Sequence, residues 1–201
     1  MNVILWIAFG FLLGGIPFSY LLGHLFLHTD IRQYGDGNPG AANVWKAGSW
    51  RTGFPACILD YLKALIPVGL AYLKYDIKNW ELIPIALAPV IGHAFSPFLH
   101  FRGGKAVAVT FGIWSVLLPG EGILGLGLSM FIFFILQNVD SWTVILGMLF
   151  FFTYLLFKQV SIVILLIWLG NIIILTYKHR QDLKQPVILK SWVLKLLRIN
   201  N

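Results

Sequence analysis

The residues best suited to binding an anion gather in one short glycine-rich stretch near the start of the chain. Residues 35–43 read Gly-Asp-Gly-Asn-Pro-Gly-Ala-Ala-Asn, and Lys46 follows about one helical turn later. Glycines free the backbone to take positive φ values, so that successive N–H groups can converge on one negatively charged group. A plain loop between two helices would have a similar composition. On the anion-binding interpretation the candidates are Asp36, Gly37, Asn38, Gly40, Asn43 and Lys46.

A second cluster, Arg102-Gly103-Gly104-Lys105, directly precedes an apolar run of helical length. Two glycines at the N-terminus of a helix would expose backbone N–H groups, and the helix dipole and the flanking cations would favour a phosphate there. The glycine spacing and the missing Ser or Thr after the lysine exclude a Walker loop. Lys and Arg are common in the cytoplasmic loops of membrane proteins, which would explain Arg102 and Lys105 but not the paired glycines. We therefore favour a phosphate-binding loop.

Polar residues also occur inside the apolar segments. Asp60 and Lys63 are three residues apart, so they face one side of a helix, and we expect them to form a structural pair inside the bundle. Ser19 follows Pro17 in the first apolar segment, and we expect it to lie at a break in that helix.

The histidines that flank the later segments are further candidates. His93 lies near the end of the apolar stretch that leads to the second cluster, but the sequence offers no evident set of further ligands, so no metal is predicted. His179 and Arg180 close the last apolar segment, where a cation would equally serve as a helix C-terminal cap. No serine or cysteine triad is evident. Any chemistry would therefore rest on anion binding near a lipid interface.

Composition determines the kind of structure that must position these residues. Hydrophobic residues make up 58% of the 201 residues, charged residues only 11%, and the mean hydropathy is +0.80. A soluble domain of this length needs more charge to cover its surface, so the sequence predicts an all-α membrane protein with many spans. The formal net charge is +7, and many of the basic residues are clustered near the C-terminus. In a membrane protein such clusters mark the cytoplasmic side, so this charge does not indicate a nucleic-acid partner.

The single cysteine, Cys57, cannot form an internal disulfide.

Seven apolar segments are candidate membrane spans, and together residues 1–201 are expected to form a single transmembrane domain. The segments cover about residues 3–27, 54–74, 81–99, 105–119, 121–138, 141–157 and 160–177. We read the first as a retained span, because it lacks a basic leading region and is too long for a signal-peptide core. Gly10 and Gly14, which lie in it four residues apart, would let a neighbouring helix approach closely.

Seven spans place the two termini on opposite sides of the membrane, and the distribution of Lys and Arg indicates which side is which. With the C-terminus inside, the cytoplasmic segments hold 11 of the 15 Lys and Arg residues and the outer segments hold 3. The sequence therefore predicts an outside N-terminus and a cytoplasmic C-terminus. Residues 187–198 alternate apolar and basic side chains, so we expect them to lie along the inner interface as an amphipathic tail.

Several long motifs follow one another in an order typical of one enzyme family. They are residues 15–23 (GIPFSYLLG), Asp30-Ile31-Arg32 leading to residues 37–41 (GNPGA) and Asn43, Asp60-x-x-Lys63, residues 92–105 (GHAFSPFLHFRGGK) and His179-Arg180. In these motifs the chain resembles the bacterial acyl-phosphate:glycerol-3-phosphate acyltransferases, the PlsY family, over essentially its whole length.

The resemblance implies that a fatty acyl group passes from acyl phosphate to the primary hydroxyl of glycerol 3-phosphate, giving 1-acylglycerol 3-phosphate and inorganic phosphate. It implies no cofactor, contact with membrane lipid, and a bacterial plasma-membrane location with the active site facing the cytoplasm. The family offers no obvious protein base, so the departing phosphate would accept the hydroxyl proton. The catalytic residues would be Lys105, His179 and Asn38. Substrate binding would fall to Ser19, Asp36, Gly37, Gly40, Asn43, Lys46, His93, Arg102, Gly103, Gly104, Arg180 and Asp182.

The chain departs from the family pattern at positions close to the expected site. Family members usually have Ser at position 36, Thr at 42, Arg at 46, Gly at 106, Thr at 109 and Asn at 182, where this chain has Asp36, Ala42, Lys46, Ala106, Val109 and Asp182. The two aspartates add negative charge where a phosphate would bind. This motivates a second hypothesis, a paralogue of the same fold with a different acyl acceptor. A third hypothesis is a small transporter or non-catalytic lipid-binding protein, suggested by the intramembrane charges Asp60 and Lys63.

Overall fold

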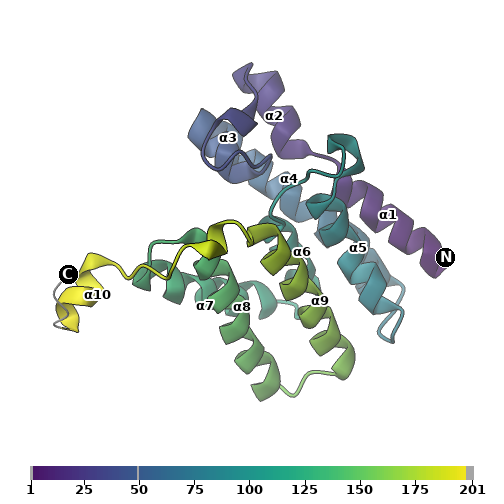
Figure 1. The fold of residues 1–201 in the computed structure, drawn as a ribbon. Coiled ribbons are helices and arrows are strands. Elements are labelled where there is room, and N and C mark those ends of the chain that lie inside the picture. Colours follow the sequence, from purple (N-terminus) through teal and green to yellow (C-terminus); the bar gives the residue numbers. More distant parts are fainter. Residues whose placement is uncertain (1, 49, 198–201) are drawn as a thin grey trace.

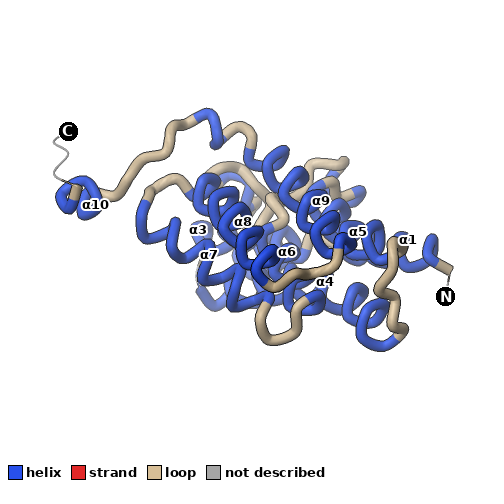
Figure 2. Tube along the Cα trace, turned by 90° about the horizontal axis from the view of Figure 1, so that it is seen from below, coloured by secondary structure: helices blue, strands red, loops and turns tan. Residues whose placement is uncertain are grey.

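The computed structural model describes residues 2–48 and 50–197, and within these residues the fold is entirely helical (Figures 1 and 2). The helices are α1 (Val3–Gly15), α2 (Phe18–Leu27), α3 (Ala41–Ala47), α4 (Trp50–Gly69), α5 (Leu82–Ala94), α6 (Val107–Leu117), α7 (Gly122–Leu136), α8 (Asp140–Phe157), α9 (Ile162–His179) and α10 (Ser191–Leu196). Short turns of other helix types cover Ile31–Gln33, Leu70–Lys74, Pro97–Leu99 and Asp182–Lys184. The predicted all-α class is confirmed.

Five segments of the described chain are long and apolar enough to cross a membrane. They are Val3–Leu27, Trp50–Lys74, Leu82–Leu99, Asp140–Phe157 and Ile162–His179. The other two predicted spans, 105–119 and 121–138, contain the shorter helices α6 and α7. At 1.5 Å per residue the 11 residues of α6 extend only about 16 Å, against a hydrocarbon core of about 30 Å. This short helix is surrounded by protein, since most of its side chains are buried.

The first span is broken in the middle, as predicted, because α1 ends at Gly15 and α2 begins at Phe18, on either side of Ile16 and Pro17. The break frees backbone carbonyls, and side chains from α4 and from the loop after α5 satisfy them. Ser96 donates to the Gly15 carbonyl at 2.5 Å, and the Lys63 amine donates to the Ile16 carbonyl at 3.0 Å. A broken helix is tolerated inside a membrane when its free carbonyls are paired in this way.

Helix α1 packs closely along α5, and glycines permit the contact. A Cβ added to Gly14 would lie 2.3 Å from the Pro89 carbonyl oxygen of α5, and one added to Gly10 would lie 3.1 Å from the Pro89 ring. The predicted role of Gly10 and Gly14 in close helix packing is therefore confirmed.

A buried polar contact ties α6 to α9 in the middle of the core. Trp114 of α6 donates to Asn171 of α9 at 3.0 Å, and Asn171 donates to Thr110 of α6 at 2.9 Å. All three side chains are fully buried. Because buried polar groups are costly unless paired, this contact fixes how far α6 and α9 can slide along one another. The position of the loop before α6 is set by the same contact.

The chain beyond α9 runs back across the end of α7 and then leaves the bundle (Figure 1). Asn138 donates its backbone N–H to Ile188, Lys190 donates to Leu136, and the Trp192 indole donates to Ile135. Helix α10 follows, with Leu196 and Leu197 exposed. The amphipathic tail predicted for residues 187–198 falls in this segment and stays a prediction, and its last residue, Arg198, lies outside the described residues.

Candidate functional site

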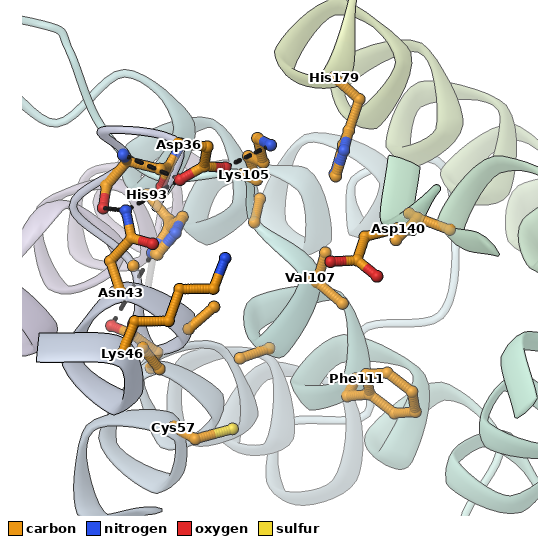
Figure 3. Close-up of a pocket in the computed structure, with 18 residues that line it drawn as sticks. Asp36, Asn43, Lys46, Cys57, His93, Lys105, Val107, Phe111, Asp140 and His179 are labelled. Atoms are coloured by element: carbon orange, nitrogen blue, oxygen red, sulfur yellow. Dashed lines mark hydrogen bonds and ion pairs between the residues drawn. The ribbon is translucent and has the colours of Figure 1, made fainter. Parts of the chain in front are cut away.

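One cavity of about 370 Å³ joins segments that are far apart in the sequence (Figure 3). Its walls come from the glycine-rich loop with α3, from α4, from the end of α5, from the start of α6, from the start of α8 and from the end of α9. The lining residues are Asp36, Asn38, Gly40–Asn43, Lys46, Cys57, Asp60, His93, Lys105–Ala108, Phe111, Asp140, Val144 and His179. Asn38 and Lys105, which belong to the two predicted anion-binding clusters, therefore share one site.

The glycine-rich loop folds back on α3 in the way its composition predicts. Gly35 and Gly37 have φ values of +57° and +73°, which a residue with a Cβ would adopt only with strain. Asn43, the third residue of α3, holds the loop closed, because its side-chain amide donates to Asp36 and to the Asn38 carbonyl, both at 2.8 Å. The Asn43 side chain is buried, and among the described residues its oxygen has no hydrogen-bond partner. Asn43 thus shapes the loop.

Lys105 lies between two carboxylates from distant parts of the chain. Its amine is 2.5 Å from Asp36 of the glycine-rich loop and also forms an ion pair with Asp182, which follows α9. Burial lowers the pKa of Lys105, but its hydrogen bonds to Asp182 and Asp36 outweigh burial and raise the pKa above the ordinary value. Burial likewise raises the pKa of each aspartate, yet the contact with Lys105 outweighs it, so both lie below the usual range. All three groups are charged at neutral pH.

The charges on the cavity wall are mixed. Two cations, Lys46 and Lys105, face three carboxylates, Asp36, Asp60 and Asp140. Figure 3 shows the Lys46 amine and the Asp140 carboxylate both pointing into the open space. A phosphate in this cavity would meet a favourable field near Lys46, and near Lys105 once Lys105 turns toward it in place of the aspartates.

The paired glycines of the second cluster have a packing role in addition to the predicted phosphate binding, which stays a prediction. The Gly104 N–H donates to the His93 carbonyl at 3.0 Å, so it is not free for an anion. A Cβ on Gly103 would lie 1.9 Å from that carbonyl oxygen, and one on Gly104 would lie 2.1 Å from the His93 ring. Only glycine allows the loop to pass so close to the end of α5. Neither Gly103 nor Gly104 lines the main cavity.

The exposed N–H groups come instead from the start of α6, two residues after Lys105. The helix begins at Val107, and Ala106 precedes it in the left-handed region with a φ of +63°. Within the described part of the chain no side chain caps this helix end, and Ala106, Val107 and Ala108 line the cavity. The first N–H groups of a helix have no partner within it and carry the positive end of the dipole. The sequence predicts free N–H groups and the positive end of a helix dipole at Gly103 and Gly104. In the structure they lie at the start of α6, a few residues later in the chain.

His179 and two neighbours form a polar chain at the edge of the cavity. The His179 Nδ1 atom is 2.8 Å from the Ser141 hydroxyl, and that hydroxyl donates to Asp182 at 3.1 Å. The other ring nitrogen, Nε2, is buried and has no partner in residues 2–48 and 50–197. In Figure 3 the ring points from the end of α9 into the cavity.

Ser141 and Asp140 were missed as site residues, because the sequence marks residues 138–140 only as a turn between spans. Nothing in the spacing along the chain connects position 141 with position 179 or 182. A turn of polar residues at the site end of the bundle was the one available signal.

A fully buried group of polar side chains lies beneath the cavity. Asp60 and Lys63 form the predicted pair at 2.8 Å, with side chains 2% and 1% exposed. Ser19 donates to Asp60 at 2.5 Å, and the His93 ring is 3.9 Å from Asp60. Ser19 thus supports the pair and does not line the main cavity, whereas His93 does.

Arg102 and Arg180 line a second cavity of about 360 Å³ beside the first. This second cavity also contains Gly37, Gly103 and Lys178, and it shares Asp36 and Asn38 with the main one. Arg180 stacks on Tyr177 at 4.1 Å and donates to the Tyr177 carbonyl at 2.6 Å, the capping contact that was the alternative to substrate binding. Within residues 2–48 and 50–197, no group of three or more His, Cys, Asp or Glu side chains is placed to hold a metal ion.

Comparison with known proteins gives consistent matches over the whole site. The sequence profile of the family described as glycerol-3-phosphate acyltransferase matches residues 4–187. Glycerol-3-phosphate acyltransferase 1 of Thermotoga maritima is 36% identical over 193 residues, covering 89% of this chain and 95% of that protein. Two crystal structures of PlsY (YgiH), described as an integral membrane glycerol 3-phosphate acyltransferase, are also similar. The glycerol 3-phosphate form has a TM-score of 0.82 at 27% identity and the lysophosphatidic acid form 0.80 at 26%, each covering 99% of this chain and 94% of that chain.

Proposed function

Because the chain belongs to the glycerol-3-phosphate acyltransferase family and is a membrane acyltransferase of phospholipid synthesis, we propose that its main cavity joins acyl phosphate to glycerol 3-phosphate. The products are 1-acylglycerol 3-phosphate and inorganic phosphate. The observation that carries this proposal is the meeting of the glycine-rich loop, Lys105 and His179 around one cavity. That arrangement supplies cations, backbone N–H groups and a histidine within one space.

Phosphate binding falls to Lys105, Lys46 and the N-terminus of α6. Lys105 exchanges its contacts with Asp36 and Asp182 for a substrate phosphate, and the uncapped N–H groups of Val107 and Ala108 add the positive end of the helix dipole. Asn38, Gly40 and Asn43 border the same space. The neighbouring cavity contributes to substrate binding through Gly37, Arg102, Gly103 and Arg180. The packing around the site depends on Ser19, Asp60, Lys63 and Gly104.

The acyl chain lies against the apolar wall of the cavity. Val107, Phe111 and Val144 form that wall together with Cys57. Cys57 is exposed on α4, within a span, so the wall reaches the lipid-facing surface of the bundle. A single-chain acyl donor dissolved in the bilayer could enter by this route.

The site faces the cytoplasm of a bacterium from its plasma membrane. The ends of α5 and α9 and the starts of α6 and α8 all border the cavity, so the long polar segments 28–48, 95–106 and 180–197 lie at the same end of the bundle. These segments hold most of the Lys and Arg residues, which favours the inner side. Residues 1–201 act as one transmembrane domain, with the tail along the inner surface. A C-terminal reporter that is active only in the cytoplasm tests this orientation.

The direct test uses purified protein with palmitoyl phosphate and glycerol 3-phosphate. We expect phosphate release matched by formation of 1-acylglycerol 3-phosphate. A parallel screen keeps palmitoyl phosphate fixed and varies the acceptor among glycerol, glycerol 3-phosphate and choline. Acylation of another acceptor in preference to glycerol 3-phosphate would contradict the proposal and restore the different-acceptor hypothesis. Family membership favours an enzyme over a transporter. Transport of a substrate across proteoliposome membranes, without any acyl transfer, would support the transporter hypothesis instead.

A further inference from the structure

The carboxylates that line the main cavity differ in whether the protein already occupies them. Asp36 is paired with Lys105, and Asp60 is paired with Lys63. Asp140, the first residue of α8, forms neither an ion pair nor a side-chain hydrogen bond with any other described residue. Because a carboxylate has two oxygens that accept hydrogen bonds, Asp140 keeps its full acceptor capacity for a ligand.

A cation without a partner faces the same space. Lys46 of α3, like Asp140, has no ion pair in residues 2–48 and 50–197. Figure 3 shows its amine and the Asp140 carboxylate entering the open part of the cavity from different helices. A small molecule that contacts both side chains must offer an acceptor or a negative charge to Lys46 and a hydrogen-bond donor to Asp140.

The cavity changes from polar to apolar along the first turn of α8. Val144 lies four residues after Asp140, so it is on the same face of the helix, and it belongs to the apolar wall of the cavity. Asp140 therefore lies at the border between the part suited to phosphate and the part suited to an acyl chain. In acyl transfer this border is where the carbon atoms of the acceptor must lie, between its phosphate and the new ester.

We propose that Asp140 is a specificity-determining residue that accepts a hydrogen bond from the secondary hydroxyl of glycerol 3-phosphate. This inference rests on the proposed function for its acceptor. A carboxylate attracts a hydroxyl and repels a phosphate, so Asp140 turns the hydroxyl-bearing carbons toward α8 and the phosphate toward Lys46 and Lys105. With these two ends held, the primary hydroxyl has one position from which to reach the acyl carbonyl carbon.

Asp140 makes and breaks no covalent bond in this arrangement. The primary hydroxyl oxygen forms the bond to the acyl carbon, the bond from that carbon to the phosphate oxygen breaks, and the hydroxyl proton goes to the departing phosphate. The secondary hydroxyl keeps its proton throughout. The carboxylate thus orients the acceptor and selects for it.

A structural role for Asp140 is the alternative. It lies in the first turn of α8, where a negative charge interacts favourably with the helix dipole. Loss of that contribution would weaken the start of α8 and would impair every acceptor alike. The two roles can be separated because the hydroxyl can be removed from the ligand as well as the carboxylate from the protein.

The experiment compares glycerol 3-phosphate with 3-hydroxypropyl phosphate, which keeps the phosphate and the primary hydroxyl but lacks the secondary one. Purified full-length protein is assayed with palmitoyl phosphate and each acceptor. A hydrogen bond to a charged group typically contributes about 10-fold or more, so the wild type should prefer glycerol 3-phosphate by about 10-fold or more in kcat/KM. In Asp140→Ala the preference should disappear, whereas Asp140→Asn, whose amide oxygen still accepts, should keep part of it.

Two control variants show whether the change is specific to the hydroxyl. Val144→Ala alters the same face of α8 one turn later, so it should change kcat/KM for both acceptors in equal proportion. Glu121→Ala removes another acidic residue at a helix N-terminus, before α7, and should leave both values unchanged. An equal loss for the two acceptors in Asp140→Ala would reduce Asp140 to its role in the helix and overturn the inference, as would an undiminished preference.

Calorimetric titration without an acyl donor separates this inference from the proposed function. Each acceptor is titrated into the wild type and Asp140→Ala in detergent, and only the wild type should bind glycerol 3-phosphate more tightly than 3-hydroxypropyl phosphate. A wild type that releases no phosphate from palmitoyl phosphate would contradict the proposed function, while the titration would still decide the role of Asp140. Equal affinity of the wild type for both molecules, or no binding of glycerol 3-phosphate, would overturn it.

Discussion

Lys63 and Lys105 both form ion pairs with aspartate, and these two lysines differ in almost every other respect. Lys63 pairs with Asp60 three residues away on the same helix, and both side chains are almost fully buried. Lys105 bridges Asp36 and Asp182, which come from loops far apart in the sequence, and its side chain is 22% exposed beside a cavity. The first pair is completed within the bundle, where Ser19 and the Ile16 carbonyl supply the remaining partners.

The difference indicates what each pair can do. Opening the Lys63 pair would leave a charge in a dry interior, so it holds the break between α1 and α2 in place. Opening the Lys105 pair exposes its charges to a cavity that a ligand can enter, so a substrate phosphate can replace the two carboxylates at modest cost. Burial and sequence separation, not the pairing itself, distinguish a structural ion pair from one suited to substrate binding.

The largest expected effect is loss of the folded protein when Lys63 is removed. Lys63→Ala strands the buried Asp60 carboxylate, and breaking such a pair costs about 3–5 kcal/mol. We expect a large fall in the yield of monodisperse protein and in Tm, measured by size exclusion and intrinsic fluorescence in detergent. The double variant Asp60→Asn/Lys63→Met removes both charges and should recover much of the loss. A Lys63→Ala protein as stable as the wild type would contradict the structural role.

Removing Lys105 should give the opposite pattern, with activity lost and stability kept. Loss of one donor to a developing anion typically lowers kcat by about 10²–10³-fold, so we expect Lys105→Ala to lose at least about 100-fold in phosphate release from palmitoyl phosphate. Its partly exposed ion pairs contribute little to stability, and Tm should change by a few degrees at most. Lys158→Ala, which removes an ion pair with Glu121 at the other end of the bundle, is the matched control and should retain full activity.

Removing the carboxylates that hold Lys105 should improve phosphate binding. In Asp36→Ser one negative charge leaves the site, and we expect the KM for glycerol 3-phosphate to fall by about 3- to 10-fold, since a unit charge at about 4 Å contributes on the order of 1 kcal/mol or more. The pKa of Asp36 lies below its ordinary value, so its stabilising contact with Lys105 is present above the ordinary pKa and is lost only as pH falls through the lowered one. The KM ratio should therefore stay constant between pH 6.5 and 8. An unchanged or higher KM would show that Asp36 helps to bind the acceptor.

The fold class and several contacts of the site could be predicted from the sequence because they depend on local patterns. Apolar segment length indicated the helices, Pro17 indicated the break, and the spacing of Asp60 and Lys63 indicated their pair. The meeting of Asn38 with Lys105 followed from the clustering of polar loops at one end of a bundle.

The remaining features depend on tertiary packing, which local patterns do not record. Gly103 and Gly104 are expected to bind an anion, and the structure adds a role that the sequence does not record, since both make room for the end of α5. Helix α6 is shorter than predicted because protein surrounds it. The contact of Ser141 with His179 joins the start of one span to the end of the next, and no spacing along the chain predicts such a contact.

The smallest expected effect concerns the turn that places Lys105 before α6. Ala106 has a φ of +63°, a region that costs a residue with a Cβ roughly 1–2 kcal/mol. Ala106→Gly relieves that strain but removes one buried methyl group worth about 0.8 kcal/mol, so we expect a net gain of up to about 1 kcal/mol and a Tm higher by about 2–4 °C. Ala108→Gly, two residues later within the helix, should lower Tm instead. If both variants lowered Tm alike, the strain at Ala106 would be too small to matter, and the turn before α6 would be held by the packing of Gly103 and Gly104 alone.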